Sequence, residues 1–103
     1  MTIAAAGSLF AVERSTEEEI GAELARLGDW ERDGEAIAKT FERADFVDSI
    51  RFVDRLVEPA EDMGHHPDLE ISWNKVRVSL STHSAGGLTA NDFELARRID
   101  ALA

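Results

Sequence analysis

The apolar residues of the chain recur with two periods, and the first of these predicts a helix. Within residues 15–28, a large aliphatic residue appears at every third or fourth position: Ile20, Leu24 and Leu27. Ser15 or Thr16 fits the N-cap, and Glu18 or Glu19 three residues further on completes a capping box. We therefore expect an amphipathic helix in this segment.

A β-hairpin is predicted over residues 29–42. Asp33-Gly34 is typical of a type I′ turn, in which both central residues take a positive φ. The side chains of the second strand fall alternately on two sides, with Ile37, Lys39 and Phe41 on one and Ala36, Ala38 and Thr40 on the other. The pattern alone leaves open which of these sides is buried.

Residues 44–64 have the period of a longer helix. Asp45 is its expected N-cap, and a stripe of apolar residues follows at spacings of three and four: Phe46, Ile50, Val53, Val57 and Ala60, widened by Phe52 and Leu56. Pro59 lacks a backbone N–H, and its ring clashes with the carbonyl one turn earlier. We therefore expect this helix to kink or to end near Pro59.

After this helix the period changes to two, which predicts a second hairpin. Two alternating runs follow each other with a slip of phase between them: Leu69, Ile71 and Trp73, then Val76, Val78 and Leu80. The slip indicates a turn around Asn74-Lys75. A glycine-containing loop comes next, and Thr89, with Asp92 three residues later, marks the start of a last helix.

The order of elements is therefore helix, hairpin, helix, hairpin, helix. Hairpins pair their strands antiparallel, and amphipathic helices need a sheet face on which to bury their apolar side. This order predicts one two-layer α+β domain, expected to span residues 15–103 after an N-terminal extension of residues 1–14. A chain of 103 residues has room for one modest hydrophobic core.

Composition and charge narrow the classes of function. The chain has 21 acidic and 11 basic residues, a net charge of −10, which repels the phosphates of nucleic acids and anionic lipids. We therefore expect no direct contact with nucleic acid and no membrane role. The lack of cysteine excludes disulfides and thiolate chemistry. No signal peptide and no membrane-spanning run is recognisable, so a cytoplasmic protein is expected.

The candidate chemistry lies in the three histidines of the chain. His65 and His66 stand side by side before Pro67, and His83 follows the last predicted strand. Because a hairpin returns the chain to where it began, His83 is expected to come back beside the other two. Three imidazoles would then meet at one rim of the sheet.

The residues alone leave several roles open for these imidazoles. Each could be a structural loop or capping residue. The three could also form a metal site, with Glu61 or Asp62 as a further ligand, although adjacent histidines rarely share one ion. A third role is proton transfer, since an imidazole with an ordinary pKa of about 6.5 exchanges protons near neutral pH. Activation of a nucleophilic serine by a histidine is a weaker hypothesis, because no serine lies in a nucleophile-elbow motif.

The run from Ala60 to Asp100 closely resembles the pterin-4a-carbinolamine dehydratases. The features of that family that this chain carries are Glu61, His65-His66-Pro67, Trp73, Thr82-His83, Gly86-Gly87-Leu88-Thr89 and Asp92, with Trp30 ahead of the first hairpin. The resemblance covers essentially everything from residue 15 onward. The combined pattern is far more specific than a pair of adjacent histidines.

The resemblance implies a fold and an activity. The fold is a four-stranded antiparallel sheet with three helices on one face. The activity is the dehydration of 4a-hydroxytetrahydropterin to quinonoid dihydropterin, which recycles the pterin cofactor of aromatic amino acid hydroxylases. It implies acid–base catalysis with no cofactor and no metal, a small-molecule pterin as the partner, and a homodimer or homotetramer.

The resemblance also implies roles for particular residues. His65, His66 and His83 are the catalytic histidines, with His65 and His83 as the proton-transfer pair on the two faces of the ring and His66 closer to substrate binding. Glu61 and Asp92 have supporting roles, Glu61 by orienting a histidine. The implied substrate-binding set is Trp30 as an apolar wall, with Gly64, His65, His66, Pro67, Ser81, Thr82, His83 and Ser84.

Three departures from the family pattern leave the histidines in place. Pro59 lies where ordinary helix formers are usual, Trp73 replaces a frequent tyrosine, and Ser84 replaces a frequent acid.

The competing class of function is non-enzymatic. Some family members act as dimerisation partners of transcription factors, and related folds without the histidines serve as assembly factors. Retention of all three histidines favours the enzyme.

Overall fold

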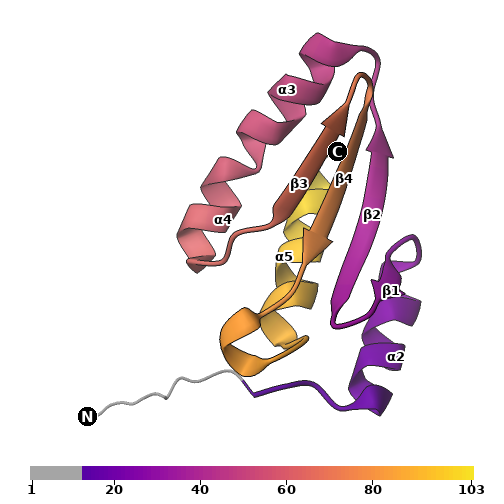
Figure 1. The fold of residues 1–103 in the computed structure, drawn as a ribbon, viewed down its shortest axis with the longest axis vertical. Helices are drawn as coiled ribbons and strands as arrows, with labels where there is room; N and C mark the ends of the chain where they lie inside the picture. The colour runs from indigo at the N-terminus through magenta and orange to yellow at the C-terminus, as the bar shows by residue number, and fades with distance from the viewer. Residues whose placement is uncertain (1–12) are drawn as a thin grey trace.

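The structure is a computed structural model that describes residues 13–103 (Figure 1). The elements follow in the order α2 (Glu17–Leu27), β1 (Glu31–Asp33), β2 (Ala36–Glu42), α3 (Phe46–Arg55), α4 (Val57–Met63), β3 (Asp68–Ser72), β4 (Lys75–Leu80), the 3₁₀ turn η2 (His83–Ala85) and α5 (Ala90–Leu102). All neighbouring strands pair antiparallel in the order β1-β2-β4-β3. The predicted α+β fold is confirmed. Residues 1–12 of the predicted extension lie outside the described residues, and the domain boundary stays a prediction.

One face of the sheet and the helices that cover it form a single core. Alternate side chains of β2 and β4 pack against apolar residues of the helices, and the buried set is Ile20, Trp30, Ile37, Phe41, Phe52, Leu56, Val76, Val78, Leu80, Leu88, Phe93, Leu95, Ala96 and Ile99. The side of β2 that faces the helices is therefore the one with Ile37 and Phe41. Because α2, α3 and α5 all contribute to this set, the helices cover one face of the sheet.

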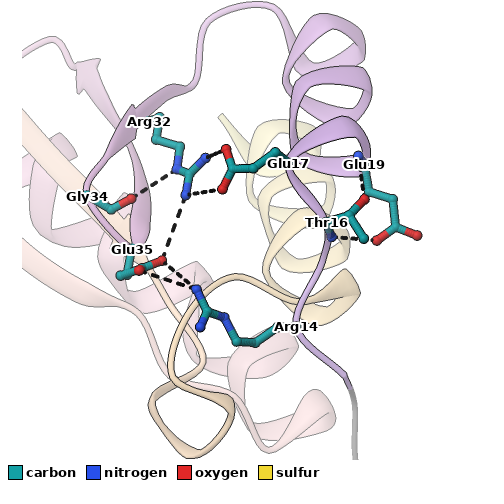
Figure 2. Close-up of polar contacts among 7 residues, drawn as sticks. All are labelled: Arg14, Thr16, Glu17, Glu19, Arg32, Gly34 and Glu35. Carbon is teal, nitrogen blue, oxygen red and sulfur yellow. Dashed lines mark hydrogen bonds and ion pairs between the residues drawn. The ribbon is translucent and has the colours of Figure 1, made fainter.

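The three predicted N-caps are confirmed; Asp45 caps α3 by accepting the N–H of Asp48 at 2.8 Å, and the other two form capping boxes. The hydroxyl of Thr16 accepts the N–H of Glu19 at 3.1 Å, and the Glu19 carboxylate accepts the N–H of Thr16 at 2.7 Å (Figure 2). At the start of α5, Thr89 is the N-cap and the carboxylate of Asp92 accepts its N–H at 2.9 Å. Helices α2 and α5 therefore start at capping boxes, in which side chains satisfy otherwise unpaired N–H groups.

The first hairpin turn lies one residue after its predicted position. Asp33 pairs with Ala36, so the two central residues are Gly34 and Glu35 rather than Asp33 and Gly34. Of these central residues only Gly34 has a positive φ, at 61°. A glycine at the first central position is typical of a type II′ turn, and the predicted type I′ turn is therefore wrong.

The second hairpin turn lies one residue before its predicted position. Ser72 pairs with Lys75, so the central residues are Trp73 and Asn74. The backbone carbonyl of Trp73 accepts the hydroxyl of Ser49 at 2.8 Å, and that of Asn74 accepts the N–H of Arg43 at 2.6 Å. These contacts with the start of α3 hold Trp73 at a φ of 52°, a conformation that local propensity does not favour for tryptophan.

The long helix predicted over residues 44–64 is broken into α3 and α4. The break lies at Leu56, whose N–H donates to the carbonyl of Val53 in a tightened last turn of α3. Pro59, three residues further on, has no N–H for the carbonyl of Arg55, so the expected interruption is confirmed. The longest helix of the described residues, α5, has 13 residues, and no helix among them is long and apolar enough to cross a membrane.

Candidate active site

The end of α4 sets the position of His65. Gly64 takes a left-handed conformation with φ of 58°, and its N–H donates to the carbonyl of Glu61 at 3.1 Å. The N–H of His65 then donates to the carbonyl of Ala60 at 3.0 Å, which completes a Schellman motif. A residue with a Cβ would be strained at position 64, so glycine is what allows the chain to reverse here and to carry His65 back toward α5.

The side chain of His65 contacts a buried carboxylate. Its Nε2 atom lies 2.6 Å from Oδ1 of Asp92, which comes from the first turn of α5, 27 residues further along the chain. The His65 side chain is 12% exposed and that of Asp92 is fully buried. A carboxylate can only accept hydrogen bonds, so Nε2 carries the proton of this contact and Nδ1 is the ring nitrogen that Asp92 leaves free to exchange a proton.

The second oxygen of Asp92 joins two threonines to the same network. Oδ2 accepts the hydroxyl of Thr82 at 2.8 Å and the N–H of Thr89 at 2.9 Å. The hydroxyls of Thr82 and Thr89 are also 2.8 Å apart, so Thr89 donates to Thr82 while Thr82 donates to Asp92. Asp92 is thereby fixed from the end of β4 and from the N-cap of α5, and it holds His65 with a carboxylate that cannot easily move.

His83 follows Thr82 directly and is exposed, in contrast to His65. It begins the turn η2, which lies in a loop closed by reciprocal backbone hydrogen bonds between Thr82 and Gly87 at 3.0 and 3.3 Å. Within residues 13–103, no other side chain is hydrogen-bonded to its imidazole. The segment that carries His83 is thus tied to His65 through Thr82 and Asp92, while the expected meeting of the His83 imidazole with the other two stays a prediction.

His66 belongs to the surface of the same rim. Its Nε2 atom lies 2.6 Å from Oε2 of Glu61, and the two side chains are 64% and 69% exposed. His66 and Pro67 also border an apolar groove of about 210 Å³ between α3, α4 and β3. Glu61 therefore contacts His66, while the histidine held by a buried acid is His65.

The remaining predicted site residues divide into two groups. Ser81 is engaged through its hydroxyl with the carbonyl of Glu35 at 2.7 Å, whereas Gly64 and Ser84 are exposed and Pro67 is half-buried beside the histidines. Trp30 lies apart from this group. Its ring is 3% exposed, meets Phe41 edge to face, and donates from Nε1 to Asp100 at 3.0 Å. Trp30 is therefore a core residue in the described chain, and its role as a wall of the substrate site stays a prediction.

Little in the sequence indicated that the hydroxyls of Thr82 and Thr89 would both bind around Asp92. Thr82 was expected to contact substrate and Thr89 to cap α5, yet both hydroxyls lie around Asp92. The capping box was the available signal, since it places the side chains of Thr89 and Asp92 together. In the described part of the chain, no three His, Cys, Asp or Glu side chains are grouped in a way that could hold a metal ion.

Comparisons with known proteins agree over most of the chain. The family model described as Pterin 4 alpha carbinolamine dehydratase matches residues 13–102. A relative from Thermosynechococcus vestitus named "Putative pterin-4-alpha-carbinolamine dehydratase" is 52% identical over 91 residues, 88% of this chain and 96% of the relative. A relative of the same name from Nocardia farcinica is 50% identical over 88 residues, 85% of this chain and 93% of the relative.

Two solved structures have a similar fold. The crystal structure of a transcriptional coactivator/pterin dehydratase from Brucella melitensis superposes with a TM-score of 0.84 and 35% identity, covering 88% of this chain and 99% of that one. A pterin dehydratase-like protein identified as a RuBisCO assembly factor in the alpha-carboxysome superposes with a TM-score of 0.62 and 26% identity, covering 73% and 89%. With the family model matched from end to end of the described domain, the chain belongs to the pterin 4 alpha carbinolamine dehydratase family.

Proposed function

We propose that this protein dehydrates 4a-hydroxytetrahydropterin to quinonoid dihydropterin and water by histidine acid–base catalysis. The observation that carries the proposal is the contact between His65 and the buried carboxylate of Asp92, in a network that also includes the residue before His83. A histidine held in one orientation by a buried acid is the arrangement expected of a group that transfers protons. The names of the relatives support the same reaction class.

The proposed reaction needs two proton transfers and no other reagent. The bond between C4a and its hydroxyl oxygen breaks, and a general acid supplies the proton with which the hydroxyl leaves as water. N5 gives up its proton to a general base, and its electron pair forms the double bond between N5 and C4a. The proton balance closes, because the proton donated to the hydroxyl is matched by the one removed from N5.

In this proposal Asp92 decides which nitrogen of His65 does the chemistry. With Nε2–H donated to the carboxylate, Nδ1 has a lone pair that accepts a proton, and the imidazolium that results is stabilised by the adjacent negative charge. The same Nδ1–H can then act as an acid. Positioned acid–base catalysis of this kind contributes about 10²–10⁴-fold.

The other histidines take complementary roles in the proposal. The exposed imidazole of His83 serves the second proton transfer, and His66 with Glu61 binds the substrate at the edge of the site. The backbone groups of residues 64–66 and 81–84 would hydrogen-bond the polar edge of the pterin. On the family resemblance, we also propose that this reaction recycles the pterin cofactor of aromatic amino acid hydroxylases in the cytoplasm.

A direct assay tests the proposal. Chemically generated 4a-hydroxytetrahydropterin decays without a catalyst, and the decay is followed by ultraviolet absorbance with and without the protein. We expect a rate that increases in proportion to protein concentration. A decay rate that the protein leaves unchanged, with the protein folded by circular dichroism, would refute the proposed activity.

The competing function, transcriptional coactivation or assembly of another protein, is the one for which the two similar structures are named. A coactivator or assembly factor needs a docking surface, but it does not need a histidine that is hydrogen-bonded to a buried carboxylate. The cluster of His65, Asp92, Thr82 and Thr89 supports the enzyme instead. The net charge of −10 supports, for either role, the absence of direct nucleic acid contact.

We also propose that the chain forms a homo-oligomer through the edge of the sheet at β3. All five residues of β3 are exposed, and Leu69, Ile71 and the following Trp73 present apolar side chains that are 37%, 39% and 64% exposed. Phe46, Val47 and Ile50 add apolar surface on α3. An open strand edge is complementary to itself, because two copies can pair antiparallel about a two-fold axis.

A further inference from the structure

The loop that carries His83 is held from both sides by segments distant in the sequence. This histidine loop, residues 81–89, is closed at its base by the pairing of Thr82 with Gly87. On one side the hydroxyl of Ser81 donates to the carbonyl of Glu35, in the turn between β1 and β2. On the other side the N–H of Ser15 donates to the carbonyl of Leu88 at 2.8 Å, and the backbones of Arg14 and Thr89 form an isolated antiparallel β-bridge.

An ion pair joins these two flanking segments across the loop. The guanidinium of Arg14 donates to both carboxylate oxygens of Glu35 at 3.3 Å, and we call this pair the clasp (Figure 2). Glu35 also lies 3.8 Å from Arg32, which binds Glu17 with two contacts of 2.6 and 3.2 Å. The hydrogen bond from Arg32 lowers the pKa of Glu17, and this contact extends the series of charged pairs to the first turn of α2.

Gly87 lies directly beneath the clasp. It is buried, and a Cβ placed on it would be 2.9 Å from Oε1 of Glu35 and 3.0 Å from Nε of Arg14. The clasp therefore rests on the backbone of the residue that closes the histidine loop. The conflicting atoms are the ends of flexible side chains, so an added methyl group would push the clasp aside rather than strain the fold.

We propose that Arg14 and Glu35 are positioning residues for His83, which they hold in place by pinning the histidine loop through Gly87. Neither residue touches the reacting atoms. The part of this inference that concerns catalysis rests on the proposed dehydratase function, whereas the part that concerns the loop does not. In this inference the N-terminal segment and the first hairpin regulate how long His83 stays in its reactive position.

The variants that break the clasp are Arg14→Met, Glu35→Gln and Gly87→Ala. Exposed ion pairs stabilise a protein by roughly 0.2–1 kcal/mol, so we expect the amides of Thr82, Ala85, Gly86 and Gly87 to exchange with deuterium about 1.5- to 5-fold faster, with the midpoint of global unfolding nearly unchanged. Combining Gly87→Ala with Arg14→Met should add little to either change. The double charge reversal, Arg14→Glu with Glu35→Arg, should restore slow exchange.

The matched control is the ion pair between Arg77 and Asp33. It is 2.9 Å long, similarly exposed, and attached to the same first hairpin, but it does not border the histidine loop. Arg77→Met should leave exchange at the four loop amides unchanged. Raising the ionic strength from low salt to about 1 M should mimic Arg14→Met in the wild-type protein, because exposed charges are screened within about 3 Å at that concentration.

Catalysis provides the second measurement. In Arg14→Met and Glu35→Gln we expect kcat to fall by up to the factor found for exchange and KM to rise by a smaller factor, because the same loop also presents the backbone of residues 81–84 to the substrate. The charge reversal should recover both. Unchanged exchange at the loop amides in all three variants would overturn the inference. Faster exchange with an unchanged kcat would overturn the positioning role. If the wild-type protein itself fails to dehydrate the pterin, the proposed function is refuted while the exchange experiment still decides whether the clasp holds the loop.

Discussion

Nε2 of His65 lies 2.6 Å from Oδ1 of Asp92, a carboxylate with no exposed surface. A second acid–histidine pair, His66 with Glu61, has the same distance but is exposed to solvent on both sides. The chain therefore offers a matched comparison between one buried and one exposed pair of the same chemistry. Burial, rather than distance, is expected to separate their effects.

The first prediction concerns the replacement of each of these two carboxylates by the corresponding amide side chain, Asp92→Asn and Glu61→Gln. Asp92→Asn places an NH₂ group toward either His65 or the two threonines, so either His65 loses its acceptor or Thr82 and Thr89 both lose theirs. We expect kcat to fall by about 10²-fold because the tautomer of His65 is no longer imposed. The free energy of unfolding should fall by about 1–3 kcal/mol, measured by urea denaturation. Glu61→Gln should change the unfolding energy by less than about 0.5 kcal/mol. Equal effects of the two changes would contradict the role given to Asp92.

The second prediction concerns the division of labour among the histidines. If His65 and His83 serve opposite faces of the pterin, His65→Ala should lower kcat for one 4a epimer by about 10²-fold and spare the other, and His83→Ala should show the reverse preference. His66→Ala should raise KM more than it lowers kcat. The four proteins are compared on both epimers, with circular dichroism to confirm folding. A larger kcat defect in His66→Ala than in His65→Ala would overturn these roles.

The third prediction concerns metal ions. The proposed proton transfers require no Lewis acid, so dialysis against EDTA should leave kcat and KM unchanged. The measurement is the absorbance assay before and after chelation, with a zinc add-back as the control. Activity that disappears with EDTA and returns with zinc would show that the histidines act as ligands.

The fourth prediction concerns acid stability. The hydrogen bond from Arg32 holds the pKa of the Glu17 carboxyl below its ordinary value. A group whose pKa is lower in the folded protein stabilises it above its unfolded pKa, and this stabilisation is lost as the pH falls through the folded pKa. Glu17→Gln should therefore lower the thermal midpoint at pH 7 slightly and flatten its decline below about pH 4.5. Glu18→Gln, one residue further along α2, is the control. Parallel curves for Glu17→Gln and wild type would contradict the prediction.

The fifth prediction concerns self-association. Ile71→Lys adds a charge to the apolar side of β3, and a second copy could no longer pair there without burying it. We expect the mass measured by light scattering to fall to that of one chain, with the circular dichroism spectrum retained. Thr40→Lys, on an exposed position of the central strand β2, should leave the mass unchanged. A wild-type protein that is already monomeric would rule out the interface.

The sequence pattern was sufficient wherever a local signal decided the structure. Apolar spacing identified the helices and strands, the capping boxes at Thr16 and Thr89 marked helix starts, and Pro59 marked the interruption between α3 and α4. Each of these features depends on residues within about one turn of one another. Such features are visible in a sequence because the interacting groups are close together in it.

The features that the pattern missed depend on contacts between distant residues. The turn at Trp73 and Asn74 is displaced because Ser49 and Arg43 bind its backbone, and neither is adjacent in sequence. The hydrogen bond from the Trp30 indole to Asp100, 70 residues away, is likewise invisible to a local pattern. The sequence predicts Asp92 near the start of a helix and in a supporting role. Its contact with His65, 27 residues earlier, depends on the packing of α5 against the end of α4 and has no local signal.

The position of Asp92 has a consequence for how this protein can change. One carboxylate closes the cap of α5 with one oxygen and holds His65 with the other. Most proteins can trade a little stability for activity, or the reverse, by substituting different residues for each purpose. At position 92 the two properties share a single side chain, so they cannot be adjusted separately there. Efforts to engineer a more robust variant should begin on the exposed surface of α2 and leave the first turn of α5 untouched.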